Sequence, residues 1–213
     1  MITIVNYGVG NLASIKNMLK KAGFESELAT ETGAIEKASK IILPGIGAFD
    51  HCMSEFNKSG LRETVTKKVL EGKTPLLGIC VGLQMLMENS EEGAEPGLGW
   101  IAGKTIKFKK DKLGDLKIPH MGWTNVHITK DTALTRNLGE QPRFYFVHSY
   151  YVQPDDPSDQ MLTAHYGYEF TAAVNRDNIF GAQFHPEKSH KYGMKILENF
   201  GRLWNVSGSY LSC

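Results

Sequence analysis

Short apolar runs alternate with longer amphipathic segments in the first half of the chain. In the segment 11–22, apolar side chains recur at the three- and four-residue spacing of one helix face, whereas Ile2-Thr3-Ile4-Val5 has the apolar character of a buried strand. Strands that alternate with helices are typical of a parallel sheet with helices on both faces. The predicted strands are 2–5, 24–28, 41–43 and 75–79, and the predicted helices are 11–22, 61–70 and 82–88.

The second half of the chain contains mostly strands. Its apolar runs are separated by connections that hold Gly, Pro and Asp, which favours antiparallel pairing. Because no clear linker separates the halves, we expect a single α/β domain over residues 1–213: a mostly parallel, flavodoxin-like open sheet with helices on both faces and an antiparallel β extension. The predicted strands are 104–108, 124–128, 144–147, 161–165, 172–174 and 179–184, and a closing helix is predicted over 191–204.

The composition limits the classes of function. A formal net charge of +1 over 213 residues gives no broad electrostatic reason to expect binding to nucleic acid or to an anionic membrane. No stretch approaches the roughly 18 apolar residues of a membrane span, and the first residues lack the features of a signal peptide. Cys52, Cys80 and Cys213 form no CxxC pair, which argues against a disulfide framework and a zinc site. We therefore expect a cytoplasmic protein without a metal or other cofactor.

The clearest chemical motif is Gly78-Ile79-Cys80-Val81-Gly82, between a predicted strand and a predicted helix. It matches the G-x-nucleophile-x-G elbow, in which small flanking residues permit a tight turn that lifts the nucleophile above the sheet edge. A helix N-terminus beside a cysteine favours its thiolate form. Cys80 is therefore a candidate nucleophile, and the alternative is a buried structural cysteine in a glycine-rich turn.

A second motif supplies the groups that a cysteine nucleophile needs for proton transfer. His185-Pro186-Glu187 follows an apolar strand, and we expect Pro186 to hold the chain extended so that the Glu187 carboxylate can orient the His185 imidazole. Without the elbow, the triplet would be interpreted as a histidine at a strand end and a surface glutamate. With it, the sequence predicts a triad of Cys80, His185 and Glu187.

Acyl transfer also requires donors for an oxyanion. Gly45-Ile46-Gly47 follows the predicted strand 41–43, at the same sheet edge as Cys80, and its glycines would let a peptide unit turn its N–H toward a substrate. We expect the backbone at Ile46 and Gly47, together with the N–H of Val81, to form the oxyanion hole. The alternative is that Pro44-Gly45 begins an ordinary turn.

Two further patterns carry less weight. The segment 8–13 fits a G-x-G-x-x-A dinucleotide fingerprint, but a nicotinamide site leaves the elbow and the His-Pro-Glu triplet unexplained. Among the histidines, His148 could line the pocket of the triad and His120 stays ambiguous, and no pair has convincing metal-ligand spacing. The basic run 107–112 predicts a solvated loop.

Taken together, these motifs resemble those of the class I, triad-type glutamine amidotransferases. Gly-Ile-Cys-x-Gly-x-Gln at 78–84 with a distant His-Pro-Glu marks the superfamily. Longer segments are similar to the glutaminase subunits of imidazole glycerol phosphate synthase, and the resemblance extends from Met1 to about Trp204. These segments are 6–12, 44–49, 119–123, 144–150 and 183–189.

The resemblance implies a reaction and a set of substrate contacts. Members of this family hydrolyse glutamine to glutamate and ammonia through a thioester on the cysteine that corresponds to Cys80. The chain should therefore bind glutamine and use no cofactor. By matching position, the residues expected to contact glutamine are Gln84, Ser149 and Tyr150.

The resemblance also implies an obligate partner. Family glutaminases form a heterodimer with a (β/α)8-barrel cyclase, which receives ammonia through an internal channel and makes imidazole glycerol phosphate and aminoimidazole carboxamide ribotide in histidine biosynthesis. They are nearly silent alone and are switched on by a ligand in the partner. The residues expected near the interface are Trp123, Tyr145 and Lys188.

Two departures from the family pattern leave alternatives open. Asn6 precedes Tyr-Gly where Asp is more usual, and Thr124 follows Met-Gly-Trp where Asn is usual. A paralogous glutaminase that supplies ammonia for sugar amidotransfer in surface-polysaccharide synthesis is the main alternative. A stand-alone cysteine hydrolase of similar fold and a non-catalytic scaffold that binds a barrel protein are the others, and the intact triad disfavours the scaffold. Cys52 and Cys213 have no assigned role.

Overall fold

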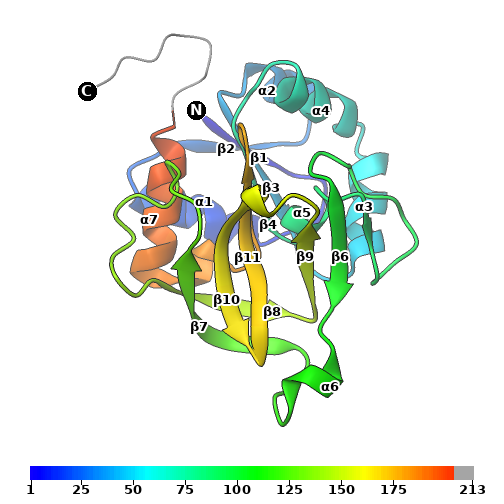
Figure 1. Ribbon diagram of the computed structural model, residues 1–213. Coiled ribbons are helices and arrows are strands. Elements are labelled where there is room, and N and C mark those ends of the chain that lie inside the picture. Colours follow the sequence, from blue (N-terminus) through cyan, green and yellow to red (C-terminus); the bar gives the residue numbers. More distant parts are fainter. Residues whose placement is uncertain (204–213) are drawn as a thin grey trace.

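A nine-stranded mixed sheet forms the centre of the computed structural model, which describes residues 1–203 (Figure 1). The strand order is β2-β1-β3-β4-β12-β11-β10-β7-β8. The strands are β1 (Ile2–Val5), β2 (Ser26–Ala29), β3 (Lys40–Gly45), β4 (Leu76–Cys80), β7 (His120–Ile128), β8 (Arg143–His148), β10 (Gln160–Tyr166), β11 (Tyr168–Arg176) and β12 (Ile179–Ala182).

The sheet has a parallel part and an antiparallel part, as the sequence predicts, but β12, which was predicted within the antiparallel extension, also pairs in parallel with β4. Strands β2, β1, β3, β4 and β12 pair in parallel, whereas β12, β11, β10, β7 and β8 pair antiparallel in that order. The carboxyl ends of neighbouring parallel strands meet at one sheet edge, which is where α/β proteins place their ligand sites. The motifs that follow β3, β4 and β12 therefore converge there.

Helices cover the parallel part on both sides. In Figure 1, α1 and α7 lie on one side of the sheet and α3 lies on the other. Ile4, Ile42 and Leu77 of the central strands have no exposed surface, and burial of each such side chain contributes about 1.5–3 kcal/mol. The helices are α1 (Leu12–Lys21), α2 (Thr32–Lys37), α3 (Phe49–Lys58), α4 (Arg62–Leu70), α5 (Val81–Gln84), α6 (Lys110–Leu113) and α7 (His190–Gly201), with 3-10 turns η1 (Pro157–Asp159) and η2 (Pro186–Lys188).

A small second sheet stands beside the main one. It has the order β5 (Asn89–Ser90), β6 (Gly103–Lys107) and β9 (Tyr150–Pro154). The strand predicted over 104–108 therefore does not extend the main sheet. The aromatic run that forms β8 continues into β9 with one intervening residue, Ser149, and the chain passes there from the main sheet to the small one.

Other elements differ from the sequence prediction. The helix predicted over 82–88 ends at Gln84, because the following backbone tightens into a turn and Glu88 N–H donates to the Gly103 carbonyl of β6. Helices α2, α3 and α6 were not predicted. The prediction of a solvated loop over 107–112 is wrong, because Lys107 ends β6, Phe108 is buried and α6 begins at Lys110. Trp204, the last residue of the predicted closing helix, lies outside the described residues. Within residues 1–203 no helix has the length and apolar content needed to cross a membrane. The assignment of 1–213 to one domain stays a prediction.

Candidate active site

Cys80 lies on a strained turn between β4 and α5. Its φ of 56° and ψ of −113° put a non-glycine residue in a sparsely populated region, and such strain persists only where the surrounding structure imposes it. The flanking glycines show how it is imposed. A Cβ at Gly82 would lie 2.0 Å from the Leu43 carbonyl oxygen, and a Cβ at Gly78 would lie 2.7 Å from the Gly82 carbonyl oxygen. The tight elbow therefore needs glycine at both positions.

His185 and Glu187 reach the same sheet edge because β12 is the parallel neighbour of β4. The His185 Nδ1 atom lies 2.9 Å from the Glu187 Oε1 atom, within hydrogen-bond distance. The backbone there differs from the prediction: His185 is extended, but Pro186 begins the 3-10 turn η2. Proline suits the first position of a helical turn because its φ is already fixed and it has no N–H to pair. The turn returns the carboxylate to the imidazole.

The environment of His185 favours its protonated form. Cys80, His185 and Glu187 are exposed by 5%, 3% and 9%. Burial by itself lowers the pKa of His185, but hydrogen bonds to Cys80 and Glu187 and the charges of both outweigh it and raise that pKa to about 9. An imidazolium placed between a thiol and a carboxylate can stabilise a thiolate and can donate a proton to a leaving group.

The predicted oxyanion segment packs directly against the elbow. Gly45 is the register partner of Cys80, and a Cβ at Gly45 would lie 2.4 Å from the backbone nitrogen of Gly82. Gly47 has a φ of 81°, in the left-handed region that favours glycine. The structure thus packs Gly45, the residue before Ile46, against Val81 and Gly82, and the role of Ile46, Gly47 and Val81 as donors stays a prediction.

Two buried side chains that the sequence did not single out hold this segment. The Tyr7 hydroxyl donates to the Pro44 carbonyl at 2.5 Å, and the Cys52 thiol donates to the Ile46 carbonyl at 3.3 Å. Burial raises the pKa of Cys52 to about 11, so the sulfur keeps the proton that it donates. Cys52 lies on α3, a helix that was not predicted, and the spacing of the cysteines along the sequence did not indicate this role.

The segment that fits a dinucleotide fingerprint supports the triad instead. A Cβ at Gly10 would lie 2.8 Å from the Pro44 side chain. The Asn11 side-chain amide approaches the Glu187 carboxylate at 3.5 Å and gives it a second, weak donor. The glycine spacing therefore reflects close packing of the β1–α1 turn on the site.

Gln84 and Tyr150, predicted to contact glutamine, lie together. The Gln84 side-chain amide donates to the Tyr150 carbonyl at 3.1 Å and to the Gln183 side-chain oxygen at 3.2 Å. Ser149 lies at the passage from β8 to β9, and its carbonyl accepts from Phe108 N–H at 3.1 Å. Their contacts with a substrate stay predictions.

The three residues predicted near the partner interface also form a cluster. Trp123 and Tyr145 are register partners with ring centroids 6.2 Å apart, and the Lys188 ammonium lies 5.9 Å from the Tyr145 ring centroid. The Tyr145 carbonyl accepts the backbone N–H of His185 at 3.0 Å. This cluster is therefore attached directly to the triad, since Lys188 also follows Glu187 in the chain and its backbone N–H donates to the His185 carbonyl at 3.0 Å.

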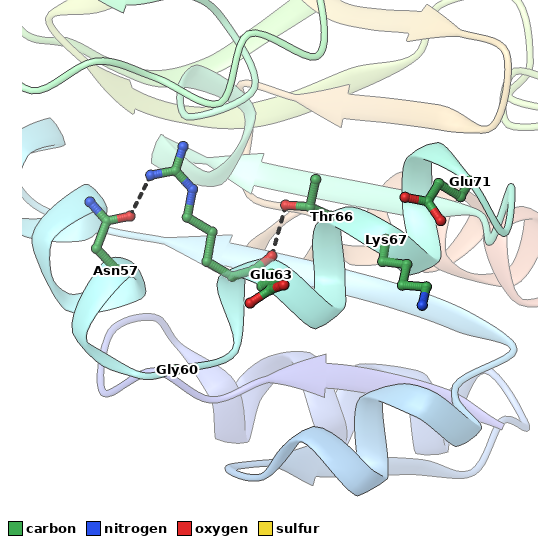
Figure 2. A pocket seen from close by; sticks show the side chains of 7 residues that line it. Asn57, Gly60, Glu63, Thr66, Lys67 and Glu71 are labelled. Atoms are coloured by element: carbon green, nitrogen blue, oxygen red, sulfur yellow. Dashed lines mark hydrogen bonds between the residues drawn. The ribbon is translucent and has the colours of Figure 1, made fainter.

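Surface hollows elsewhere do not compete with this site. Figure 2 shows an open hollow along α4 that is lined by Asn57, Arg62, Glu63 and Lys67, among others, and includes none of the triad, oxyanion or glutamine-contact residues. Its Arg62 side chain donates to the Asn57 side-chain oxygen at 2.7 Å. Within residues 1–203, no group of three or more His, Cys, Asp or Glu side chains could hold a metal ion.

Comparison with known families decides the classification. The model of the class-I glutamine amidotransferase family matches residues 3–203. The chain belongs to that family. Its predicted family and enzyme class are thereby confirmed, and the matched residues include the elbow at Cys80 and the His185-Pro186-Glu187 triplet.

Two curated relatives match over nearly their full length. Imidazole glycerol phosphate synthase subunit HisH 2 of Pseudomonas aeruginosa is 51% identical over 203 residues, which cover 95% of this chain and 100% of that protein. The protein of the same name from Methanococcus maripaludis is 52% identical over 200 residues, covering 94% and 98%.

Solved structures of lower identity confirm the predicted fold class. PurLQS from Thermotoga maritima has a TM-score of 0.72 at 20% identity and covers 93% of this chain and 96% of that chain. A glutamine amidotransferase from the same organism has a TM-score of 0.60 at 18% identity, covering 87% and 75%. At such identities the likeness concerns the fold alone.

Proposed function

We propose that this chain is the glutaminase subunit of an imidazole glycerol phosphate synthase and works in histidine biosynthesis. The observation that carries the chemistry is a buried His185 between the Cys80 thiol and the Glu187 carboxylate, with its pKa raised to about 9. The observation that supports the pathway is identity of 51–52% with two HisH subunits over nearly the whole chain.

The reaction proceeds in two halves. The Cys80 sulfur attacks the side-chain carbonyl carbon of glutamine, and the resulting oxyanion accepts hydrogen bonds from Val81 N–H and from the turned peptide at Ile46–Gly47. Collapse of this intermediate breaks the C–N bond while the His185 imidazolium protonates the leaving nitrogen, which departs as ammonia. A γ-glutamyl thioester remains on Cys80.

Water then completes the turnover. Neutral His185 takes a proton from the water as its oxygen attacks the thioester, the C–S bond breaks, and glutamate and the Cys80 thiolate are released. Glu187 keeps the His185 Nδ1–H directed away from the sulfur throughout, so that Nε2 is the atom that exchanges the proton. The sum is glutamine plus water to glutamate plus ammonia.

The partner that we propose is a (β/α)8-barrel cyclase, in a cytoplasmic heterodimer with an internal ammonia channel. Trp123 is 42% exposed and Met121 is 61% exposed on the same strand, and such exposed large apolar side chains suit an interface core. Because the Tyr145 carbonyl accepts the backbone N–H of His185, a partner that contacts this cluster can act directly on the triad.

A second candidate is ammonia supply for sugar amidotransfer by a paralogous glutaminase. Two observations support this second candidate. Asn6 and Thr124 depart from the family pattern, and both curated relatives described above are named HisH 2, with a number added to the subunit name. The triad chemistry is the same in both pathways. Only the partner and its ligand distinguish them.

Replacement of the nucleophile tests the proposed chemistry. We expect Cys80→Ala to abolish glutamate release from glutamine and to leave capture of the barrel protein unchanged, because the sulfur lies in the buried site and not on the Trp123 surface. Cyclase activity with added ammonia should survive in that complex. Unchanged glutamine turnover in the variant would exclude Cys80 as nucleophile.

A further inference from the structure

A buried pair of histidines lies outside the proposed reaction steps. His120 on β7 and His148 on β8 are 1% and 6% exposed. The His120 Nδ1 atom lies 2.9 Å from the His148 Nε2 atom, and the other nitrogen of each ring is also engaged. His120 Nε2 lies 2.8 Å from the Thr124 hydroxyl, and His148 Nδ1 lies 2.8 Å from the Tyr150 carbonyl.

The Tyr150 carbonyl determines the direction of every bond in this row. A carbonyl oxygen only accepts, so His148 Nδ1 carries the hydrogen and donates it. In a neutral ring the His148 Nε2 atom must then accept, which makes His120 Nδ1 the donor between the two rings. His120 Nε2 is left as an acceptor, and the Thr124 hydroxyl donates to it.

The surroundings keep both rings neutral. Aromatic rings pack around the pair: His120 stacks on Phe146 at 5.0 Å between centroids and lies 4.1 Å from Tyr166, and Phe108 lies 5.2 Å from His148. Burial lowers the pKa of His120 to about 4, and burial together with the charges of His120 and His185 lowers the pKa of His148 to about 3. A neutral pair has one fixed order of donors and acceptors.

The same carbonyl also fixes the amide of Gln84. The Tyr150 oxygen has two lone pairs, one facing His148 Nδ1–H and the other accepting from Gln84 Nε2 at 3.1 Å. Gln84 Nε2 also donates to the Gln183 side-chain oxygen at 3.2 Å. With its nitrogen held by two acceptors, the Gln84 amide cannot exchange its ends, and its oxygen is the atom left to accept from a ligand.

We propose that Thr124, His120 and His148 are positioning residues that hold the Tyr150 carbonyl and, through it, the orientation of the Gln84 amide that receives glutamine. The proposal rests on the proposed contact of Gln84 and Tyr150 with the substrate. It also gives the departure at Thr124 a role: a hydroxyl donates to His120 there, as the side-chain amide of the Asn usual at this position could.

The first test measures glutamine affinity by calorimetry in a Cys80→Ala background, which binds without turnover. Thr124→Val removes the donor to His120 with little change in volume, and we expect the Kd for glutamine to rise about three- to tenfold, the effect of losing one hydrogen bond. Thr124→Ser should restore the affinity. Thr129→Val is the matched control, because the Thr129 hydroxyl bonds only to the Gln160 carbonyl within residues 1–203.

The second test reads the tautomers directly. In the ¹⁵N spectrum of the histidine-labelled wild-type chain, we expect His120 and His148 to be neutral with the hydrogen on Nδ1. In Thr124→Val the His120 Nε2 resonance should move toward that of a nitrogen without a hydrogen bond. A hydrogen on His148 Nε2 in the wild type would overturn the proposal, whether or not any variant folds.

Gln84→Ala separates the two ways in which the proposal can fail. If Gln84→Ala weakens glutamine binding and Thr124→Val does not, the positioning role is wrong and the substrate contact stands. If Gln84→Ala leaves the Kd unchanged, the substrate contact is wrong and the positioning role falls with it. The proposed function is tested separately, by glutamate release from the chain that retains Cys80, and neither of these binding results changes that test.

Discussion

Replacing the triad carboxylate by its amide isolates the charge of Glu187 from its shape. In Glu187→Gln the side chain keeps its length and one oxygen, which can still accept from His185 Nδ1 at the observed 2.9 Å. The Asn11 amide, 3.5 Å from the same oxygen, also favours oxygen at that position. The variant should therefore fold, keep the orientation of His185, and lose only the negative charge.

The expected cost follows from the change in bond type. A hydrogen bond to a charged partner contributes about 1.5–3 kcal/mol and a neutral one about 0.5–1.5 kcal/mol, so the difference is about 1–2 kcal/mol. If the imidazolium is needed in the transition state, that difference lowers kcat about 5- to 30-fold. Loss of the carboxylate also lowers the pKa of His185, which Glu187 helps to raise to about 9 in the wild type.

The assay is glutamate release measured from pH 6.5 to pH 10 under conditions where the wild type is active. Because imidazolium is the acid, wild-type kcat should fall as pH rises through about 9, and the variant's fall should begin at lower pH. The matched control is Glu198→Gln on α7, whose carboxylate pairs with Lys195 and Arg202 away from the triad and whose loss should leave kcat unchanged.

Two results would refute this reasoning in different ways. An unchanged kcat and pH profile in Glu187→Gln would show that the carboxylate has no part in the reaction. A loss near the 10⁴-fold seen when the carboxylate of a serine protease triad becomes an amide would show that the imidazole adopts the wrong tautomer. In that case Asn11 does not hold the oxygen of the amide toward His185.

Three further perturbations have definite expected results. Gly82→Ala puts a Cβ 2.0 Å from a backbone oxygen and should lower the Tm by about 6–12 °C. Gly33→Ala is the control, because Gly33 in α2 has open space around it, and this variant should not lower the Tm. Equal melting temperatures of the two variants would contradict the proposed packing at the elbow. His120 and His148 have pKa values lowered from 6.5 to about 4 and about 3, so the unfolded chain binds the additional protons and the free energy of unfolding should fall as pH drops from about 6.5 to 4. Urea titrations of the wild type and of a His148→Phe variant at several pH values check this. The same dependence of the free energy of unfolding on pH in both proteins would contradict it. Cys52→Ala should lower kcat about fivefold by freeing the Ile46 carbonyl, and Cys52→Ser should restore it; equal loss in both would indicate packing alone.

The local sequence was sufficient to predict the buried central strands of the sheet. Strands β1, β3 and β4 are buried on both faces, so most of their residues are apolar and the runs are easy to recognise. Helix α3 could also have been predicted, because its buried residues Phe49, Cys52, Met53 and Phe56 have the i, i+3, i+4 and i+7 spacing of one helix face. The helix after the elbow was predicted too long because its end depends on a bond from Glu88 to β6, 15 residues away.

The candidate site was predictable for a different reason. Cys80 and His185 each follow an apolar strand whose end can be recognised in the sequence, and the chemistry of a triad placed them together. The sequence assigned 179–184 to the antiparallel extension and did not predict that β12 is the parallel neighbour of β4. The supporting contacts could not be predicted in this way. The Asn11 contact with Glu187 spans 176 residues, and the bond between His120 and His148 depends on register between strands.

The most direct test of the account is glutamate release from glutamine by the purified chain, alone and with the proposed barrel partner, each with and without the ribotide ligand proposed for that partner. The account predicts little release by the chain alone and a large increase only when barrel and ribotide are both present. Full activity of the isolated chain would contradict the gated glutaminase and favour an independent hydrolase. Silence in every mixture would contradict the histidine pathway, and the sugar pathway's partner would then be the next one to add.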